Sequence, residues 1–106
     1  MKYARMAVAT APADKLEEFV RVYEQEIFPA LKSVKGFQGA YLFTNAFSGE
    51  GVSLTFWTSE QDAMAYDRSG QYAELVAKVR PFLTAEPTLK RYHVSAETPF
   101  PAEALR

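Results

Sequence analysis

Residues 39–57 read GAYLFTNAFSGEGVSLTFW, in which two apolar runs flank a short glycine-containing segment. The runs at 39–47 and 52–57 are rich in aromatic and β-branched residues, which favour strands. The segment SGEG between them holds two glycines, which are common in tight turns. The stretch therefore predicts an antiparallel hairpin at the centre of the chain.

The chain before this hairpin predicts one strand followed by one helix. Residues 3–10, YARMAVAT, form a lightly charged strand candidate. Between 13 and 35, apolar residues recur at three- and four-residue steps, which is the pattern of a helix with one buried face. Asp14 favours the first turn of this helix, Pro29 is expected to kink its last turns, and Gly36 is expected to end it.

The chain after the hairpin predicts a second helix and a last strand. Ser59, followed three residues later by an acid, is a typical helix start. Ser69 and Gly70 are expected to interrupt this helix, which then continues at helical spacing as far as Pro81. Residues 88–96, TLKRYHVSA, form the strand candidate.

The resulting order, β-α-β-β-α-β, is that of the ferredoxin-like α+β sandwich. Two βαβ halves with right-handed crossovers place four strands in one antiparallel sheet and both helices on one of its faces. A length of 106 residues fits a single core. We therefore expect one domain over residues 1–97, followed by an irregular tail at 98–106.

The sheet face opposite the helices is expected to be apolar. Tyr41 and Phe43 share a face in the strand alternation. The clear charges on the four strands are Arg5, Lys90 and Arg91. A face in contact with water would instead alternate apolar with polar or charged residues. The simplest cover is a second copy of the sheet, which predicts a homodimer through the sheet faces; the alternative is the tail, folded back with Phe100 and Leu105 as anchors.

Composition argues against several classes of function. Twelve basic and 13 acidic residues give a net charge of −1 without a basic cluster, so nucleic acid is not an expected partner. The absence of cysteine and the single histidine, His93, leave no histidine- or thiolate-based set of metal ligands within one chain. Because there is no signal peptide and no run of about 18 apolar residues, we expect a cytoplasmic protein without a membrane span.

A resemblance to a known superfamily is carried by three stretches, EIFPALKSVKGFQGAYLF (26–43), LTFWTSEQDAMAYDRSGQY (54–72) and RYHV (91–94). With Pro29 at the helix end and a Trp-x-Ser at 57–59, residues 3–96 resemble the antibiotic biosynthesis monooxygenase superfamily of dimeric α/β-barrel proteins. The resemblance implies a dimer that pairs sheet to sheet. It also implies the activities of that superfamily, which includes quinol and polyketide monooxygenases without a metal or flavin, and haem-degrading enzymes.

The haem-degrading branch can be compared position by position. It has an asparagine in strand one and a second tryptophan and a histidine in helix two, where this chain has Ala7, Tyr66 and Val76. Because valine cannot ligate iron, axial haem binding of that kind is not expected, and we expect no cofactor. A cofactor-free oxygenase needs none, since a deprotonated phenol or hydroquinone can itself donate an electron to O₂ in a dry cavity.

The candidate ligand pocket consists of Trp57, Tyr66, Tyr72 and Asn45. Trp57 matches a tryptophan common in the superfamily, and it either packs at the strand–helix junction or lines the pocket. Tyr66 and Tyr72 are six residues apart, on different faces of a helix, so one is expected in the core while the other reaches a cavity. Asn45 either hydrogen-bonds a quinone-like carbonyl or serves the turn that follows it.

The candidate catalytic base is His93, because the unperturbed pKa of histidine lies near neutrality. The alternative for His93 is a structural or interface role. Arg5 and Arg91 are expected close together on strands one and four. They either hold an anionic ligand or pair with acidic groups at the dimer contact.

Three hypotheses about function stay open at this point. The first is a cofactor-independent monooxygenase that acts on a small aromatic or quinol substrate. The second is a non-catalytic dimeric protein of the same fold that binds a small ligand or responds to stress, and the third is a structural domain. A cavity of about 300 Å³ or more with convergent polar groups is expected for the first two, and a solidly packed interior for the third.

Overall fold

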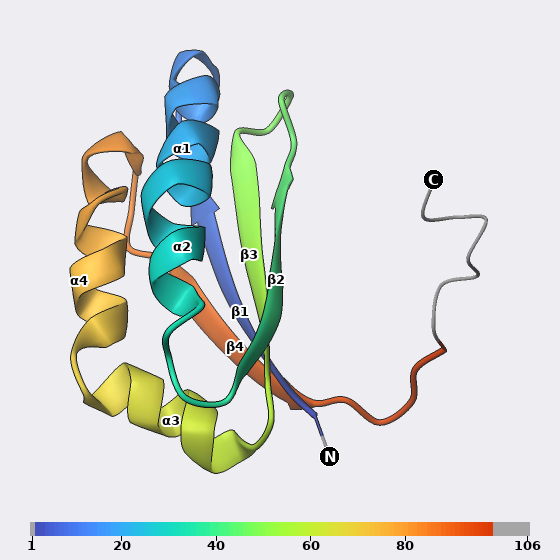
Figure 1. Ribbon diagram of the computed structural model, residues 1–106. Coiled ribbons are helices and arrows are strands. Elements are labelled where there is room, and N and C mark those ends of the chain that lie inside the picture. The colour runs from blue at the N-terminus through green and yellow to red at the C-terminus, as the bar shows by residue number, and fades with distance from the viewer. Residues whose placement is uncertain (1, 99–106) are drawn as a thin grey trace.

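Figure 1 shows a computed structural model of the chain, which describes residues 2–98. Its elements are β1 (Tyr3–Thr10), η1 (Ala13–Lys15), α1 (Leu16–Val22), η2 (Tyr23–Ile27), α2 (Phe28–Leu31), β2 (Phe37–Thr44), β3 (Glu50–Trp57), α3 (Glu60–Arg68), α4 (Gln71–Ala77), η3 (Arg80–Phe82) and β4 (Thr88–His93). The predicted β-α-β-β-α-β order is confirmed. None of the helices in this part of the chain has the length and apolar character needed to cross a membrane.

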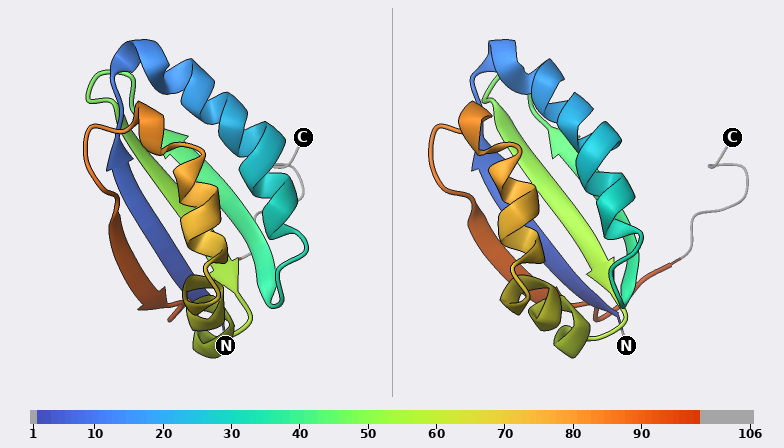
Figure 2. Two further views of the ribbon diagram at one scale, coloured as in Figure 1. Left: turned by 90° about the vertical axis from the view of Figure 1, so that its left-hand side faces the viewer. Right: turned by 60° about the vertical axis from the view of Figure 1, so that its left-hand side comes forward.

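The four strands form one antiparallel sheet in the order β2-β3-β1-β4. Figure 2 shows the helices together on one face of this sheet. This is the α+β, ferredoxin-like arrangement that the sequence predicts. The edge strands β2 and β4 do not pair with each other, so the sheet is open, and a single chain does not close a barrel.

The first helical run contains a wide turn that the sequence analysis did not predict. Residues of η2 form a π-helix, in which the N–H of Phe28 donates to the carbonyl of Tyr23 five residues earlier. Pro29 explains the position of this turn, because proline has no N–H to donate and its ring collides with the carbonyl four residues before it. The run ends at Leu31 rather than at residue 35.

The second helical run begins and breaks where the sequence predicts. The Oγ of Ser59 accepts a hydrogen bond from the backbone N–H of Asp62 at 3.1 Å, which caps α3. Gly70 has a φ of +87°, a left-handed conformation that most side chains avoid. It divides α3 from α4, so the two segments do not continue a single helix.

The hairpin is confirmed; three of its four strand ends lie two to three residues away from those expected, and the fourth, at Trp57, is as expected. β2 begins earlier, at Phe37, and ends at Thr44, because Asn45 already belongs to the turn. Gly49 has a φ of +75°, and a Cβ at this position would collide with the carbonyl oxygen of Ala11. The turn therefore packs directly on the end of β1.

The core lies between the sheet and the helices. Its largest fully buried side chains are Phe19, Leu31, Trp57 and Val79. Phe19 and Leu31 come from the predicted apolar stripe of the first helical run, which confirms that stripe as the buried face.

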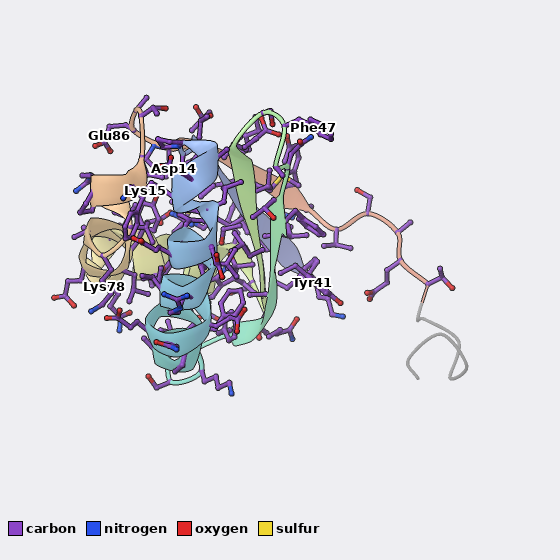
Figure 3. All side chains as sticks on the ribbon, turned by 90° about the horizontal axis from the view of Figure 1, so that it is seen from above. Asp14, Lys15, Tyr41, Phe47, Lys78 and Glu86 are labelled. Carbon is purple, nitrogen blue, oxygen red and sulfur yellow. The ribbon has the colours of Figure 1, made fainter. Side chains whose placement is uncertain are left out.

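The opposite sheet face is apolar over the described strands. Tyr41, Leu54 and Met6 form one row of neighbours across β2, β3 and β1, and Lys90 of the edge strand β4 ends that row. Tyr41 is 49% exposed and Phe43 is 52% exposed, and their rings stack with centroids 5.8 Å apart. Figure 3 shows Tyr41 on the side of the sheet away from the helices. The alternative cover, through Phe100 and Leu105, lies outside the described residues.

Candidate functional site

A small cavity of about 20 Å³ lies between the sheet and the helices. Six of its lining side chains are polar: Arg5, Tyr23, Ser53, Thr55, Tyr66 and Tyr72. This volume is enough for about one water molecule. It is far below the roughly 300 Å³ at which a small-molecule pocket begins.

Strands β1 and β3 form the floor of the cavity. Arg5 lies opposite Thr55 in the register, and Ala7 lies opposite Ser53. The Oγ1 of Thr55 donates to the backbone carbonyl of Arg5 at 3.2 Å and accepts from the Nε1–H of Trp57 at 2.9 Å. These two hydrogen bonds hold Thr55 in place and leave the single indole donor of Trp57 paired.

Arg5 is a buried cation that is paired with an acid of the same chain. Arg5 as a whole is 3% exposed, and its Nε donates to Oδ1 of Asp67 on α3 at 2.9 Å. The other carboxylate oxygen, Oδ2, accepts from Nη2 of Arg91 at 2.6 Å. Arg5 and Arg91 face each other across β1 and β4, which confirms their expected proximity. Their shared acid is Asp67 of the same chain, and not an acid across a dimer contact.

The fully buried nitrogen Nη2 of Arg5 is left without a hydrogen bond. Nη2 lies 2.8 Å from Oδ1 of Asp67, but its N–H bonds are not directed at that oxygen. Among residues 2–98, it is the buried side-chain nitrogen that has no hydrogen-bond partner. Buried polar groups in folded proteins are normally paired, so an unpaired cationic donor beside a cavity indicates a place for a polar or anionic group.

Three of the four predicted pocket residues form a continuous aromatic cluster. Trp57 stacks on Tyr66 at a centroid distance of 5.0 Å, and Tyr66 meets Tyr72 edge to face at 6.0 Å. The Cζ of Arg5 lies 4.0 Å from the ring centroid of Tyr72 and 5.3 Å from that of Tyr66. Tyr66 and Tyr72 line the cavity, whereas Trp57 lies behind Tyr66 with no exposed surface. Of its two predicted roles, the packing role of Trp57 is therefore the one that the geometry favours.

The tyrosines of the cavity stay protonated at neutral pH. Burial raises the pKa of Tyr66 well above its usual range, and the charge of Arg5 opposes this only in part. Burial also raises the pKa of Tyr72 and of Tyr23, against smaller opposing effects that include Arg5 for both. All three phenols are therefore neutral hydrogen-bond donors.

Tyr72 forms the boundary between the cavity and the solvent. It is partly exposed, whereas the other lining residues are buried. It lies in the first turn of α4, two residues after the left-handed Gly70.

The structure does not bring Asn45 and His93 to the cavity. The Oδ1 of Asn45 accepts from the backbone N–H groups of Phe47 and Ser48, at 2.9 and 3.3 Å, so Asn45 serves the hairpin turn. His93 is exposed at the end of β4, and its ring meets the ring of Tyr3 edge to face at 5.2 Å. Its role as a base stays a prediction.

Sequence reasoning missed four residues of the site: Ser53 and Thr55 on the floor of the cavity, Asp67, and Tyr23. Asp67 gave no signal beyond its position next to Tyr66, because its partner Arg5 is 62 residues away in the chain. Tyr23 belonged to the apolar stripe of the first helical run, and the π-helical turn η2 places it in the cavity wall. Such turns are frequent at functional sites.

The cavity wall and its surroundings also bear on metal and haem ligation. Among residues 2–98, no group of three histidine or acidic side chains is placed to hold a metal ion. Ala7, Tyr66 and Val76, the positions used by the haem-degrading branch, do lie together in the cavity wall. Neither Ala7 nor Val76 offers a donor atom, and the volume is about 20 Å³. These residues do not fit a histidine-ligated haem.

The sequence family described as antibiotic biosynthesis monooxygenase matches residues 2–78. The chain belongs to this family. Membership agrees with the resemblance found in the three sequence stretches and with the ferredoxin-like fold. None of the curated protein sequences gives a significant match.

Several solved structures share the fold of this family member. Rv0793 from Mycobacterium tuberculosis is 19% identical with a TM-score of 0.71, over 93% of this chain and 100% of that one. The haem degrader MhuD from the same organism, solved with two haems in its active site, is 17% identical with a TM-score of 0.76, over 92% and 99%. A monooxygenase from the gene ActVA-Orf6 of Streptomyces coelicolor, solved with the ligand nanaomycin D, is 19% identical with a TM-score of 0.68, over 93% and 92%.

Titration with haemin is expected to give no saturable Soret shift of the kind that an axial ligand in this cavity would produce. The reason is that Ala7 and Val76 replace the side chains that the haem-degrading branch uses at this cavity. The measurement is an absorbance titration of the wild type and of His93→Ala. A stoichiometric complex with a defined axial ligand that persists in His93→Ala would contradict the prediction.

Proposed function

We propose that the chain is a cofactor-independent monooxygenase that acts on a small aromatic or quinol substrate held between the sheet and the helices. Membership of the family and the similarity to a monooxygenase solved with a small ligand support this proposal. The observation that carries it is the buried Arg5, whose Nη2 is ion-paired with Asp67 but makes no hydrogen bond, beside a cavity walled by three tyrosines.

The reaction needs only the substrate and O₂. A deprotonated phenol donates one electron to O₂, and the resulting radical and superoxide combine to form a C–O bond at a ring carbon that carries hydrogen. Loss of water cleaves the O–O bond and leaves a second ring carbonyl, so phenol and O₂ give quinone and water. The substrate supplies all four electrons. The protein contributes a dry cavity, orientation and electrostatic stabilisation.

The closed cavity does not hold a substrate of this size. Its volume of about 20 Å³ is what the structural-domain hypothesis expects, so volume alone does not favour an enzyme. The buried guanidinium of Arg5 favours a binding site, because a domain that only packs has no need of a buried cation with an N–H donor that makes no hydrogen bond. Entry of an aromatic ring therefore requires the side chain of Tyr72 to move outward.

A second candidate function is binding without turnover. It is favoured by the chemistry of the cavity wall, in which none of the described lining residues is a carboxylate or an imidazole. The predicted base, His93, lies at the surface. A protein that holds a small aromatic ligand needs no base.

Oxygen uptake with a panel of hydroquinones is expected to distinguish the two functions. We expect O₂ consumption with the wild type that depends on the hydroquinone and falls in Arg5→Met, because Arg5 stabilises the substrate anion. His93→Ala tests the predicted base. Ligand binding without O₂ consumption for every hydroquinone would support the second candidate and contradict the first.

The proposed assembly is a homodimer through the sheet faces. It is supported by the open sheet and by the exposed Tyr41, Phe43 and Tyr92. On the same face of the described strands the charged residues are Lys90 and Glu50. An apolar face of this extent is uncommon on a monomer. A second copy of the same face is apolar as well and would cover it.

A further inference from the structure

We propose that the cavity binds its aromatic ligand as a monoanion, with Arg5 as the counter-cation. The inference rests on the proposed function only in that an aromatic molecule enters this cavity. It assigns the ionisation state of that molecule and the group that recognises it.

The first argument is the balance of charge around Arg5. Arg5 and Arg91 share one carboxylate, that of Asp67, so the cluster carries two positive charges and one negative charge. The side chain of Arg91 is 40% exposed, so water stabilises its charge, whereas the side chain of Arg5 is 4% exposed and lacks this hydration. Opposite charges attract more strongly in such a buried place than in water. A ligand anion would balance the cluster, and a neutral ligand would not.

The second argument concerns the other groups that face Arg5. The titratable groups around it are Tyr23 from η2, Tyr66 and Asp67 from α3, Tyr72 from α4 and Arg91 from β4. The three tyrosines are neutral at physiological pH and supply O–H donors. Apart from Asp67, this set contains no negative group. Glu60 and Arg68, which lie with Asp67 around a surface hollow, carry opposite charges.

The third argument is the ring that now covers the guanidinium. Tyr72 stacks on Arg5 at 4.0 Å, and it is the lining residue that reaches solvent. Arginine stacks readily on planar aromatic groups while its edges donate hydrogen bonds. A planar ligand would have to approach with its ring edge toward Nη2, because the N–H bonds lie in the plane of the guanidinium and not above it. Its anionic oxygen would add the hydrogen bond that Nη2 lacks.

This assignment removes the need for a base in the cavity wall. A phenol or enol that is already ionised in water needs no base on entry, because Arg5 offers the anion a counter-charge inside the cavity. The phenolate is the form that donates an electron to O₂. Arg5 is then a catalytic residue that touches the substrate oxygen, and His93 is not required.

The test uses two probes of similar shape that differ in charge. 2-Hydroxy-1,4-naphthoquinone is an anion at neutral pH, whereas 1,4-naphthoquinone has no ionisable group. Binding is followed by quenching of Trp57, the one tryptophan of the chain, which stacks on the cavity wall at Tyr66. We expect the wild type to prefer the anionic probe by about 10- to 100-fold, the value of a hydrogen bond to a charged group.

Three variants separate the role of Arg5 from a general effect of charge. Arg5→Met should abolish the preference, and Arg68→Met, the same change at an exposed arginine of α3, should keep it. Asp67→Asn keeps an oxygen acceptor for Arg5 and removes the negative charge, so it should increase the preference. Asp67→Asn leaves the buried Arg5 without its counter-charge and can itself be destabilised, so the comparison of the two probes on the wild type tests the inference where a variant fails to fold.

The results of these binding experiments distinguish failure of the inference about the anion from failure of the proposed monooxygenase function. Equal affinities of the wild type for the two probes, or an unchanged preference in folded Arg5→Met, would overturn the inference and leave a monooxygenase possible. Preferential binding of the anion without O₂ uptake from any hydroquinone would support the inference and overturn the monooxygenase. Failure of both probes to bind would overturn both.

Discussion

Trp57→Ala is expected to lower the free energy of unfolding by about 3–5 kcal/mol, the usual cost of truncating a large buried aromatic residue. Trp57 has no exposed surface. The centroid of its ring lies 5.7 Å from that of Phe37 and 5.0 Å from that of Tyr66. The variant also removes the donor that fixes Thr55. Urea denaturation followed by far-ultraviolet circular dichroism measures the change without relying on the lost tryptophan.

Two matched substitutions define the expected scale. Trp57→Phe should cost much less than Trp57→Ala, because it keeps most of the ring packing. Phe47→Ala should change stability little, since Phe47 at the hairpin is 103% exposed. A Trp57→Ala protein that unfolds like the wild type but no longer binds ligand would reverse the assignment of Trp57 to packing.

At least one of Tyr41→Asp and Phe43→Asp is expected to convert the protein to a monomer or an aggregate. Both rings are about half exposed in one chain, on the face that we propose to be the dimer contact. Obligate interfaces commonly bury about 2,000 Å² or more, mostly apolar. A carboxylate there would lose its water without gaining a partner. Sedimentation velocity measures the oligomeric state.

The control for this experiment is Phe47→Asp, which places the same charge on an exposed aromatic residue of the hairpin turn. It should keep the oligomeric state of the wild type. The melting temperature of the wild type should rise with protein concentration, because association stabilises only the folded chains. A wild type that sediments as a stable monomer at micromolar concentration would contradict the proposed homodimer.

Local signals in the sequence were sufficient for most of the fold. The cap at Ser59 and the break at Gly70 depend on side-chain and backbone preferences of a few consecutive residues, and both are confirmed. Pro29 shows the limit of this reasoning. Its missing N–H predicts a disturbed helix, but whether the chain kinks or widens depends on packing, and here it forms the π-helical turn η2.

The candidate site was predicted only in part. The separation of six residues placed Tyr66 and Tyr72 on different faces of a helix, but the expected break at Ser69 and Gly70 lies between them, so this separation does not determine where the two rings point. Gly70 reorients α4, so both rings line the cavity and meet at 6.0 Å. Asn45 was given a turn role as one alternative, and its hydrogen bonds support that alternative.

The sequence by itself determined the order of the elements and the two faces of the sheet, because helix and strand periods are local properties that each segment carries with it. The apolar row at Tyr41 and the buried Trp57 both follow from the alternation along single strands. Only the tertiary structure decided that Asp67 joins Arg5 to Arg91 and that Tyr72 covers Arg5 above a cavity of about 20 Å³. These contacts join segments far apart in the chain, so they exist only once β1, α3 and α4 pack together.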